Sequence, residues 1–224
     1  MNKNKDEMEY DVNKDAWDVY RIIYNENLSF GDIRISERER PYIESTFKYK
    51  EKSTKPLNFS GETDFNFSKN RISELNRSRY EHYKKILGNN YEDLLNECCE
   101  KHHSKENISI MLQTGNMQGA KGKIGIDRLD VWLLVLNLKF KYNINLLQNH
   151  CTKENSFAIE NFLGLFDNVY EYANAIYHID KKLVDDLIES GKTPLNSIDS
   201  IKNYMNLAKR FWEQNGKFID GLNK

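Results

Sequence analysis

The sequence predicts an α+β fold: a small mixed N-terminal sheet with helices, followed by an all-helical C-terminal half. Short segments of the N-terminal half alternate polar and apolar residues, as half-buried strands do, whereas apolar residues of the C-terminal half recur at helical spacing. Only 3 Pro and 11 Gly leave little room for linkers. Residues 1–224 are therefore interpreted as a single domain, with a frayed N-terminus over residues 1–12.

Composition restricts the classes of function. Of the 224 residues, 39% are apolar, 30% are charged and 12% are aromatic, which is typical of a folded chain with a charged surface. The net charge of −1 supplies no overall basic field for nucleic acid, so phosphate recognition requires a local patch. The chain has no apolar run of about 18 residues, and its three Cys do not indicate a disulfide framework. We expect a cytoplasmic protein with no membrane partner.

The first part of the chain contains four interpretable segments. Residues 15–25 mix aromatic and apolar side chains without a firm period, which leaves strand and short helix open. Residues 38–52 interleave a dense run of charges with aromatic residues and favour a helix. Residues 55–57, K-P-L, followed by Gly61, are typical of a loop. Residues 63–67 alternate phenylalanine with polar residues, which indicates a half-buried strand.

Two helices and a strand follow. Residues 72–87 are polar and predict a helix that stops at Gly88. Residues 91–103 predict a second helix with an apolar face that includes Cys98. Residues 107–114, N-I-S-I-M-L-Q-T, alternate well enough to predict a strand.

A very apolar helix begins the C-terminal half. Asp127 is a plausible N-cap for it, and residues 129–140 are apolar at nearly every position. Asp130, Asn137 and Lys141 form one narrow polar stripe at helical spacing. A helix that is apolar almost all round lies in the core, so we expect this one to be buried.

Three amphipathic helices complete the expected fold. Residues 159–177 carry apolar side chains at i, i+3, i+4 and i+7, which predicts one long helix. Residues 180–190 predict a shorter helix with Gly191 directly after it. Residues 197–215 predict the last helix, ended by Gly216.

Residues 115–123, G-N-M-Q-G-A-K-G-K, are interpreted as a basic, glycine-rich loop between a strand and a helix. Backbone N–H groups at Gly119 and Gly122, with the charges of Lys121 and Lys123, would bind a phosphate or another anion. The spacing is not that of a P-loop, because Ala120 stands at the place of the second glycine. The alternative is a solvated connecting loop without a ligand.

The triplet Asp127, Arg128 and Asp130 supplies candidate catalytic residues at the start of the apolar helix. Asp130 lies on the polar stripe of a buried helix and needs a partner, because a buried unpaired charge is costly. One interpretation is an ion pair with a helix cap. The other is a carboxylate for metal binding or for acid–base chemistry, with Arg128 as an anion contact.

A third cluster contains two cysteines and two histidines. Cys98 with His102, and Cys99 with His103, stand four residues apart on a predicted helix and could share a metal. His150 and Cys151 are the candidates for further ligands, but the spacing matches no zinc motif. A buried thiol explains Cys98 equally well, so the sequence leaves metal and cofactor unknown.

Part of the chain resembles an uncharacterised bacterial domain family with an N-G-A-R-G run shortly before I-x-D-R-F-D and an apolar helix. The matching residues are G-A-K-G at 119–122, I-D-R-L-D at 126–130, F-L-G-L-F at 162–166, K-L-V at 182–184, and K-P-L at 55–57 with Gly61. Lysine replaces arginine at position 121, and the spacer to Asp127 is shorter than in the family. The resemblance covers about residues 50–190 and implies a shared fold without naming an activity.

Two hypotheses of function follow. In the first, a bacterial or phage-encoded protein, of the kind found in phage defence, binds or acts on a phosphate-bearing ligand such as a nucleotide or nucleic acid. Lys121, Lys123 and Arg128 would contact the phosphate, and Asp130 would orient the arginine or a metal. In the second, the protein is a non-catalytic interaction subunit, such as an inhibitor or antitoxin. Its exposed aromatic and charged segment, residues 17–49, would bind a protein partner.

Overall fold

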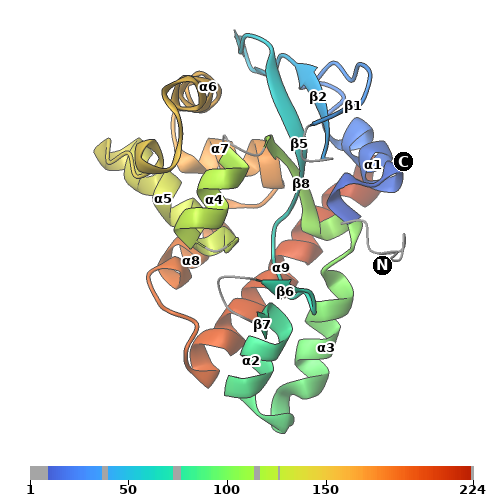
Figure 1. The fold of residues 1–224 in the computed structure, drawn as a ribbon, viewed down its shortest axis with the longest axis vertical. Helices are drawn as coiled ribbons and strands as arrows, with labels where there is room; N and C mark the ends of the chain where they lie inside the picture. Colours follow the sequence, from blue (N-terminus) through green and yellow to red (C-terminus); the bar gives the residue numbers. More distant parts are fainter. Residues whose placement is uncertain (1–9, 37–39, 73–76, 114–116, 126, 223–224) are drawn as a thin grey trace.

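A four-stranded antiparallel sheet forms the centre of the N-terminal half (Figure 1). The computed structural model describes residues 10–36, 40–72, 77–113, 117–125 and 127–222. The strands follow the order β1 (Arg34–Ile35), β2 (Pro41–Ser45), β5 (Leu57–Thr63) and β8 (Ile108–Leu112). All five residues of β8 are buried, so it crosses the core and not the surface of the molecule. The predicted strand at 107–114 is confirmed over these five residues.

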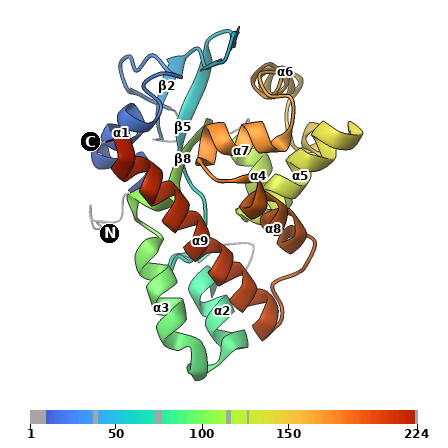
Figure 2. The same ribbon diagram turned by 180° about the vertical axis from the view of Figure 1, so that it is seen from behind.

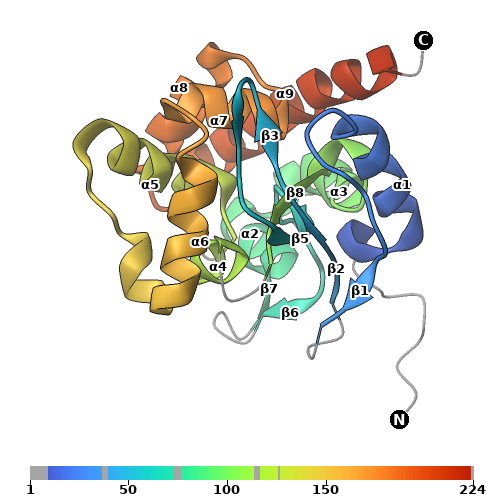
Figure 3. The same cartoon turned by 90° about the horizontal axis from the view of Figure 1, so that it is seen from above.

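Helices surround this sheet and form the whole C-terminal half, which confirms the predicted fold class. The α-helices are α1 (Lys14–Ile23), α2 (Arg79–Leu87), α3 (Glu92–Lys101), α4 (Met117–Gly125), α5 (Leu129–Tyr142), α6 (Lys153–Leu163), α7 (Val169–Tyr177), α8 (Lys181–Gly191) and α9 (Ile198–Leu222). The 3₁₀ turns are η2 (Tyr10–Val12), η4 (Asn89–Tyr91), η5 (Lys105–Asn107) and η6 (Leu147–His150). From above, the sheet lies between α1 on one side and α4 to α7 on the other (Figure 3). From behind, α9 runs diagonally across the molecule and ends beside α1 (Figure 2).

The helix predicted over residues 38–52 is wrong, and residues 37–39 lie outside the described part of the chain. Residues 41–45 form β2, and β3 (Lys48–Tyr49) pairs with β4 (Lys52–Ser53) in a short ribbon. Burial alternates along β2, with Pro41, Ile43 and Ser45 inward. That period of two is the signature of a strand, and the many charges of the segment obscured it.

The loop predicted at residues 55–57 is confirmed at Lys55 and Pro56, which connect β4 to β5, but β5 begins at Leu57 and Gly61 lies inside it. A Cβ atom at position 61 would lie 1.7 Å from the carbonyl oxygen of Asp11 and 2.5 Å from the Tyr20 hydroxyl. The glycine therefore marks a close approach of two backbones rather than a turn. This contact with β5 holds residues 10–12 in the turn η2. The prediction of a frayed N-terminus is therefore wrong for these three residues. Residues 1–9 lie outside the described part.

Two further strand and helix limits differ from the predictions. β5 ends at Thr63, and Phe65 and Phe67 are both buried beyond it, so 63–67 is not a half-buried strand. The helix predicted from residue 72 begins only at Arg79, after the ribbon of β6 (Arg71–Ile72) and β7 (Arg77–Ser78). Ser78 caps it in a capping box with Glu81. The helix predicted over 91–103 is confirmed as α3 over residues 92–101, and His102 and His103 lie in the turn after it. The open alternative at 15–25 is resolved as α1.

The helix predicted over residues 159–177 is two helices. α6 ends at Leu163, and Asn168 caps α7 by accepting hydrogen bonds from the backbone N–H groups of Tyr170 and Glu171. The break lets Phe162 and Phe166 pack edge-on against each other, with ring centroids 5.6 Å apart. Apolar spacing continues through the break because both helices face the same core, so periodicity alone could not reveal it.

Two glycines that were predicted to end helices lie within them. Gly191 is the last residue of α8, where a Cβ atom would lie 2.5 Å from the carbonyl oxygen of Asp130 in α5. Gly216 lies inside α9, which continues to Leu222, and a Cβ atom there would lie 3.0 Å from Cγ of Glu106. Both glycines permit close packing between helices and their neighbours.

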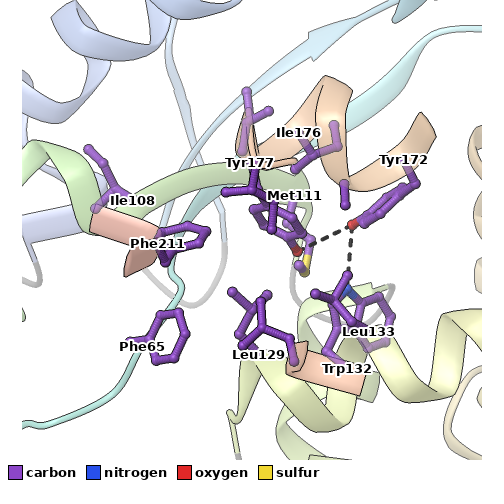
Figure 4. Packing of buried hydrophobic residues seen from close by; sticks show 14 of the residues in the cluster. Phe65, Ile108, Met111, Leu129, Trp132, Leu133, Tyr172, Ile176, Tyr177 and Phe211 are labelled. Carbon is purple, nitrogen blue, oxygen red and sulfur yellow. Dashed lines mark hydrogen bonds between the residues drawn. The ribbon is translucent and has the colours of Figure 1, made fainter. Parts of the chain in front are cut away.

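One cluster of buried apolar side chains joins the two halves. In Figure 4, residues of the sheet and of the segment after it, such as Phe65 and Met111, face residues of α5, α7 and α9. The Trp132 indole N–H donates to the Tyr172 hydroxyl over 3.4 Å. Asn107 makes a second, polar connection, since it accepts from the Trp212 indole N–H at 2.8 Å. Among the described residues, no helix combines the length and apolar character needed to cross a membrane.

Candidate functional site

The described part of the predicted glycine-rich loop is a helix. Residues 117–125 form α4, whereas Gly115 and Asn116 lie outside the described residues. Gly119 and Gly122 are half-buried within α4, and Lys123 is exposed on it. Gly122 lies beyond the first turn of α4, where backbone N–H groups are bonded to carbonyls of the preceding turn, whereas Gly119 lies in the first turn, where they have no partner within the helix. Residues 117–123 therefore form a helix and not the predicted anion-binding loop.

Lys121 is buried between α4 and β5 and is already paired. Its Nζ donates to Oε1 of Glu62 at 3.0 Å and to the Thr63 carbonyl at 3.1 Å. Gln118, one turn earlier, donates to Oε2 of Glu62 at 3.0 Å. Burial acts to lower the pKa of Lys121, but the carboxylates of Glu62, Asp64 and Asp127 outweigh it and raise the pKa. The lysine thus holds α4 against the end of β5 as a cation.

Asp64 lies deeper beside this pair. Its Oδ1 accepts a hydrogen bond from the Ser109 hydroxyl at 2.7 Å, and Oδ2 has no hydrogen-bond partner in the described part of the chain. Burial raises the pKa of Asp64 to about 7, against the opposing effects of Lys121 and the Ser109 hydrogen bond, while Glu62 raises it further. Asp64 is therefore a carboxyl group that changes charge near neutral pH.

Asp127 closes the other side of the Lys121 cluster. It is not the N-cap of α5, as predicted, because Arg128 holds that position and makes no side-chain cap hydrogen bond. Asp127 has a left-handed backbone conformation, with φ of 59°. A Cβ atom on Gly122 would lie 3.2 Å from Oδ1 of Asp127, so this glycine makes room for the carboxylate. Burial raises the pKa of Asp127, and the charge of Glu62 raises it further. The charges of Lys121, Arg79 and Arg40 act to lower this pKa.

Arg128 and Asp130 form the ion pair expected from the sequence. Arg128 Nε donates to Oδ1 of Asp130 at 3.0 Å, and Nη2 donates to Oδ2 at 2.6 Å. Nη2 also donates to the Thr193 carbonyl at 3.2 Å, and the Ser190 hydroxyl donates to Oδ2 of Asp130 at 2.9 Å. The guanidinium carbon lies 5.6 Å from the centre of the Tyr204 ring. These contacts fix the guanidinium in one plane and one position.

A hollow of about 440 Å³ opens beside this guanidinium. Its lining comes from α2, from the end of α4 and start of α5, and from the connection between α8 and α9. The lining residues are Arg79, His82, Tyr83, Ile124, Arg128, Val131, Gly191, Lys192, Thr193, Pro194, Leu195 and Asn196. Three of them are permanent cations, and no carboxylate lines the hollow within the described ranges. We call this feature the cationic hollow.

Comparison with protein-family models, curated proteins and solved structures finds no match to this chain. The resemblance to a bacterial domain family therefore stays a prediction.

The structure separates the predicted site residues into two groups. Lys121, Gly122 and Asp127 meet at the buried cluster with Glu62, whereas Arg128 lines the cationic hollow. The predictions based on sequence missed the residues that come from elsewhere in the chain, chiefly Glu62, Asp64, Arg79, Tyr83 and Lys192. Two signals were present: the carboxylates Glu62 and Asp64 on alternate residues, and Arg79 with Tyr83 four residues apart on a helix.

The cysteine and histidine cluster does not show the features of a metal site. Burial raises the pKa of Cys98 to about 12 and lowers the pKa of His102 to about 4. Nδ1 of His102 lies 3.3 Å from the carbonyl oxygen of Phe65. Over the described ranges of the chain, no three His, Cys, Asp or Glu side chains are grouped to hold a metal ion. The buried-thiol interpretation of Cys98 fits these observations.

The N-terminal segment 17–49 does not present its aromatic residues as a free surface. Trp17 is 1% exposed, and Tyr20, Tyr24 and Phe47 are fully buried. Tyr42 is half-buried in β2. The exposed aromatic surface expected for a protein partner is therefore wrong at Trp17, whose ring belongs to the core.

Proposed function

We propose that this chain binds a phosphate-bearing ligand, such as a nucleotide or nucleic acid, in the cationic hollow. The observation that carries the proposal is the fixed guanidinium of Arg128. Its Nε and Nη2 are bonded to Asp130 and Thr193, and Nη1 has no hydrogen bond to a described residue. A planar guanidinium with a free edge at the wall of a hollow matches the geometry of phosphate oxygens.

The other cations support the same class of ligand. Arg79 is buried at the wall, and Lys192 lines the hollow from the segment directly after α8. These cations line one hollow although the whole chain has a net charge of −1. Each of them also has a carboxylate near it, since Arg128 pairs with Asp130, Lys192 pairs with Glu189, and Asp127 interacts electrostatically with Arg79. None of these three carboxylates lines the hollow, so its wall presents the cationic side of each pair to a bound anion.

Asp130 has a positioning role in this proposal. Both of its oxygens are occupied, by Arg128, by the Ser190 hydroxyl and by the backbone N–H of Val131. Because these bonds occupy its carboxylate, Asp130 orients Arg128 and does not itself contact the ligand. Arg128 keeps a fixed orientation before the ligand arrives, which reduces the entropy cost of binding.

Replacement of Arg128 tests the proposal. Arg128→Lys keeps the charge and can still pair with Asp130, but it removes the planar fork. We expect the affinity for AMP, measured by isothermal titration, and for a labelled single-stranded oligonucleotide, measured by anisotropy, to fall by about tenfold or more, because a charge-assisted hydrogen bond contributes about 1.5–3 kcal/mol.

Arg34→Ala is the matched control, since Arg34 is also an arginine paired with a carboxylate, Glu44, but lies on β1. Its ligand affinity should equal that of the wild type. The proposal fails if the wild type binds neither probe at low salt, or if Arg128→Lys binds both with wild-type affinity while remaining folded.

A further inference from the structure

Two polar atoms at the cationic hollow have no hydrogen-bond partner among the described residues. They are the hydroxyl oxygen of Tyr83 and Nδ1 of His82, and both atoms are buried. Both side chains come from α2 and both line the hollow. Buried polar atoms in proteins nearly always have a partner, so two exceptions at one hollow require an explanation.

Tyr83 is 1% exposed and lies among the charges of the proposed site. Burial raises the pKa of Tyr83, the charges of Arg79 and Arg128 act to lower it, and the carboxylate of Asp130 raises it further. The hydroxyl therefore carries its proton at neutral pH and lies near both guanidinium groups. A protonated hydroxyl beside two arginines can donate to an anion that the arginines attract.

His82 differs in its hydrogen-bonding character. Burial and the charge of Arg77 lower the pKa of His82, although a hydrogen bond to the Leu195 carbonyl raises it. Because Nδ1 is the atom without a partner, Nε2 carries the proton that bonds Leu195. Nδ1 then has a lone pair and accepts a hydrogen bond, so it has no complement on a fully ionised phosphate.

Apolar side chains make up part of the wall, together with the polar residues Thr193 and Asn196. Ile124, Val131 and Leu195 line the hollow between the charged residues. The volume of about 440 Å³ exceeds what one phosphate group needs and is within the range of small-molecule sites. Apolar walls of this kind complement the carbon part of a ligand.

We infer that the cationic hollow takes an organic phosphate whose carbon part carries a hydroxyl or N–H donor, as a nucleoside monophosphate does. The Tyr83 hydroxyl donates to a phosphoryl oxygen, and Nδ1 of His82 accepts from the donor on the carbon part. The inference rests on the proposed function and adds the class of ligand to it. It also assigns a binding role to two residues that the sequence did not single out.

Tyr83→Phe tests the first contact. Loss of the hydroxyl should weaken binding of both AMP and inorganic phosphate by about tenfold, the effect of one hydrogen bond to a charged group. The ligand-free protein should be as stable as the wild type or more so, because the variant removes a buried hydroxyl without a partner. A structural role predicts the reverse: lower thermal stability and unchanged affinity.

Tyr80→Phe is the matched control on the same helix. The Tyr80 hydroxyl donates to Oδ1 of Asn96 at 2.7 Å, so its loss should lower thermal stability and leave ligand affinity unchanged. Both variants remove one phenolic hydroxyl from α2. A difference in ligand affinity between them therefore comes from the position of the hydroxyl and not from the loss of a hydroxyl as such.

His82→Gln tests the second contact, because a glutamine amide can still donate to the Leu195 carbonyl while the acceptor at Nδ1 is lost. Affinity for AMP should fall about fivefold to tenfold, and affinity for inorganic phosphate should not change. Adenosine should bind much more weakly than AMP to the wild type.

Three results would overturn the inference while the proposed function stands. The first is a wild type that binds inorganic phosphate as tightly as AMP, and the second is a Tyr83→Phe variant with wild-type affinity. The third is a His82→Gln variant that loses affinity equally for both probes. A wild type that binds none of AMP, inorganic phosphate and the oligonucleotide overturns the proposed function and the inference with it.

Discussion

At the residue scale, the enclosed carboxyl group of Asp64 couples folding to pH. Burial raises its pKa to about 7, from 3.8 for an unperturbed aspartate. Between these values the folded chain binds a proton that the unfolded chain does not, so this group's contribution to stability is complete below about pH 4. It is lost as the pH rises to 7. The groups that face it are Lys121, Glu62 and Ser109.

Asp64→Asn should remove this dependence while it keeps an acceptor for Ser109. The free energy of unfolding of the wild type, from urea titrations between pH 4 and 8, should fall by on the order of 4 kcal/mol relative to the variant as pH rises, at about 1.4 kcal/mol for each unit of pKa shift. Curves that run parallel for the two proteins would show that Asp64 does not titrate in this range.

At the element scale, the contact of α8 with α5 depends on Gly191. A Cβ atom at this position would lie 2.5 Å from the Asp130 carbonyl oxygen and 3.1 Å from the Val131 nitrogen. Gly191→Ala should move α8 away from α5 and lower the free energy of unfolding by about 1–3 kcal/mol, the usual cost of overpacking. Thermal or urea denaturation measures the change.

Gly119→Ala is the control within another helix, since a Cβ atom at position 119 meets nothing within 4 Å. An alanine there should stabilise α4 by about 0.5–1 kcal/mol, because glycine is the poorer helix former. Equal effects of the two substitutions would mean that helix propensity, rather than the α5–α8 contact, determines the role of Gly191.

Helices that bury one continuous face were predictable from sequence, and short strands were not. The apolar run at residues 129–140 indicated both that α5 is buried and where it begins and ends. The helix predicted over residues 180–190 matches α8, for which Asp180 is the N-cap. β2 was missed because the charges on either side of it obscured its alternation. β5 was missed because residues 59–62 are all buried, so its sequence does not alternate, and because Gly61 has a packing role that a single sequence does not reveal. The residues next to Gly61 in sequence do not indicate that the backbone of Asp11 packs against it in the folded chain.

The candidate site was predictable only where its partners are near in sequence. Arg128 and Asp130 are two residues apart, and the polar stripe of a buried helix pointed to their pairing. Glu62 and Lys121 are 59 residues apart, and nothing in either segment indicates the other. Tyr83 and His82 were missed for another reason: what distinguishes them is the absence of a partner in the described structure, which depends on every neighbour in space.

At the scale of the whole molecule, Asn107 joins the two halves of the core. Its side chain accepts from the backbone N–H of Phe65 and the indole N–H of Trp212, and it donates to the carbonyl oxygens of Phe65 and His102. The segment after β5 and the helix α9 therefore share one buried amide.

Asn107→Ala leaves these buried groups without a partner and should lower the free energy of unfolding by about 3 kcal/mol or more, at about 1–3 kcal/mol for each group. Because the amide serves both halves, far-UV circular dichroism and tryptophan fluorescence should show one shared transition, shifted equally. If the transitions measured by circular dichroism and by fluorescence have different midpoints, the two halves unfold independently. In that case Asn107 does not couple the unfolding of the two halves.

The buried pair of Lys121 and Glu62 also has a consequence for inheritance. A substitution at either position alone leaves a charge enclosed without its counter-ion, which is strongly destabilising, whereas two apolar residues of similar volume can replace the pair at little cost. The two positions, far apart in the gene, thus behave as one unit of variation. Descendants of this chain are expected to keep both residues or to lose both.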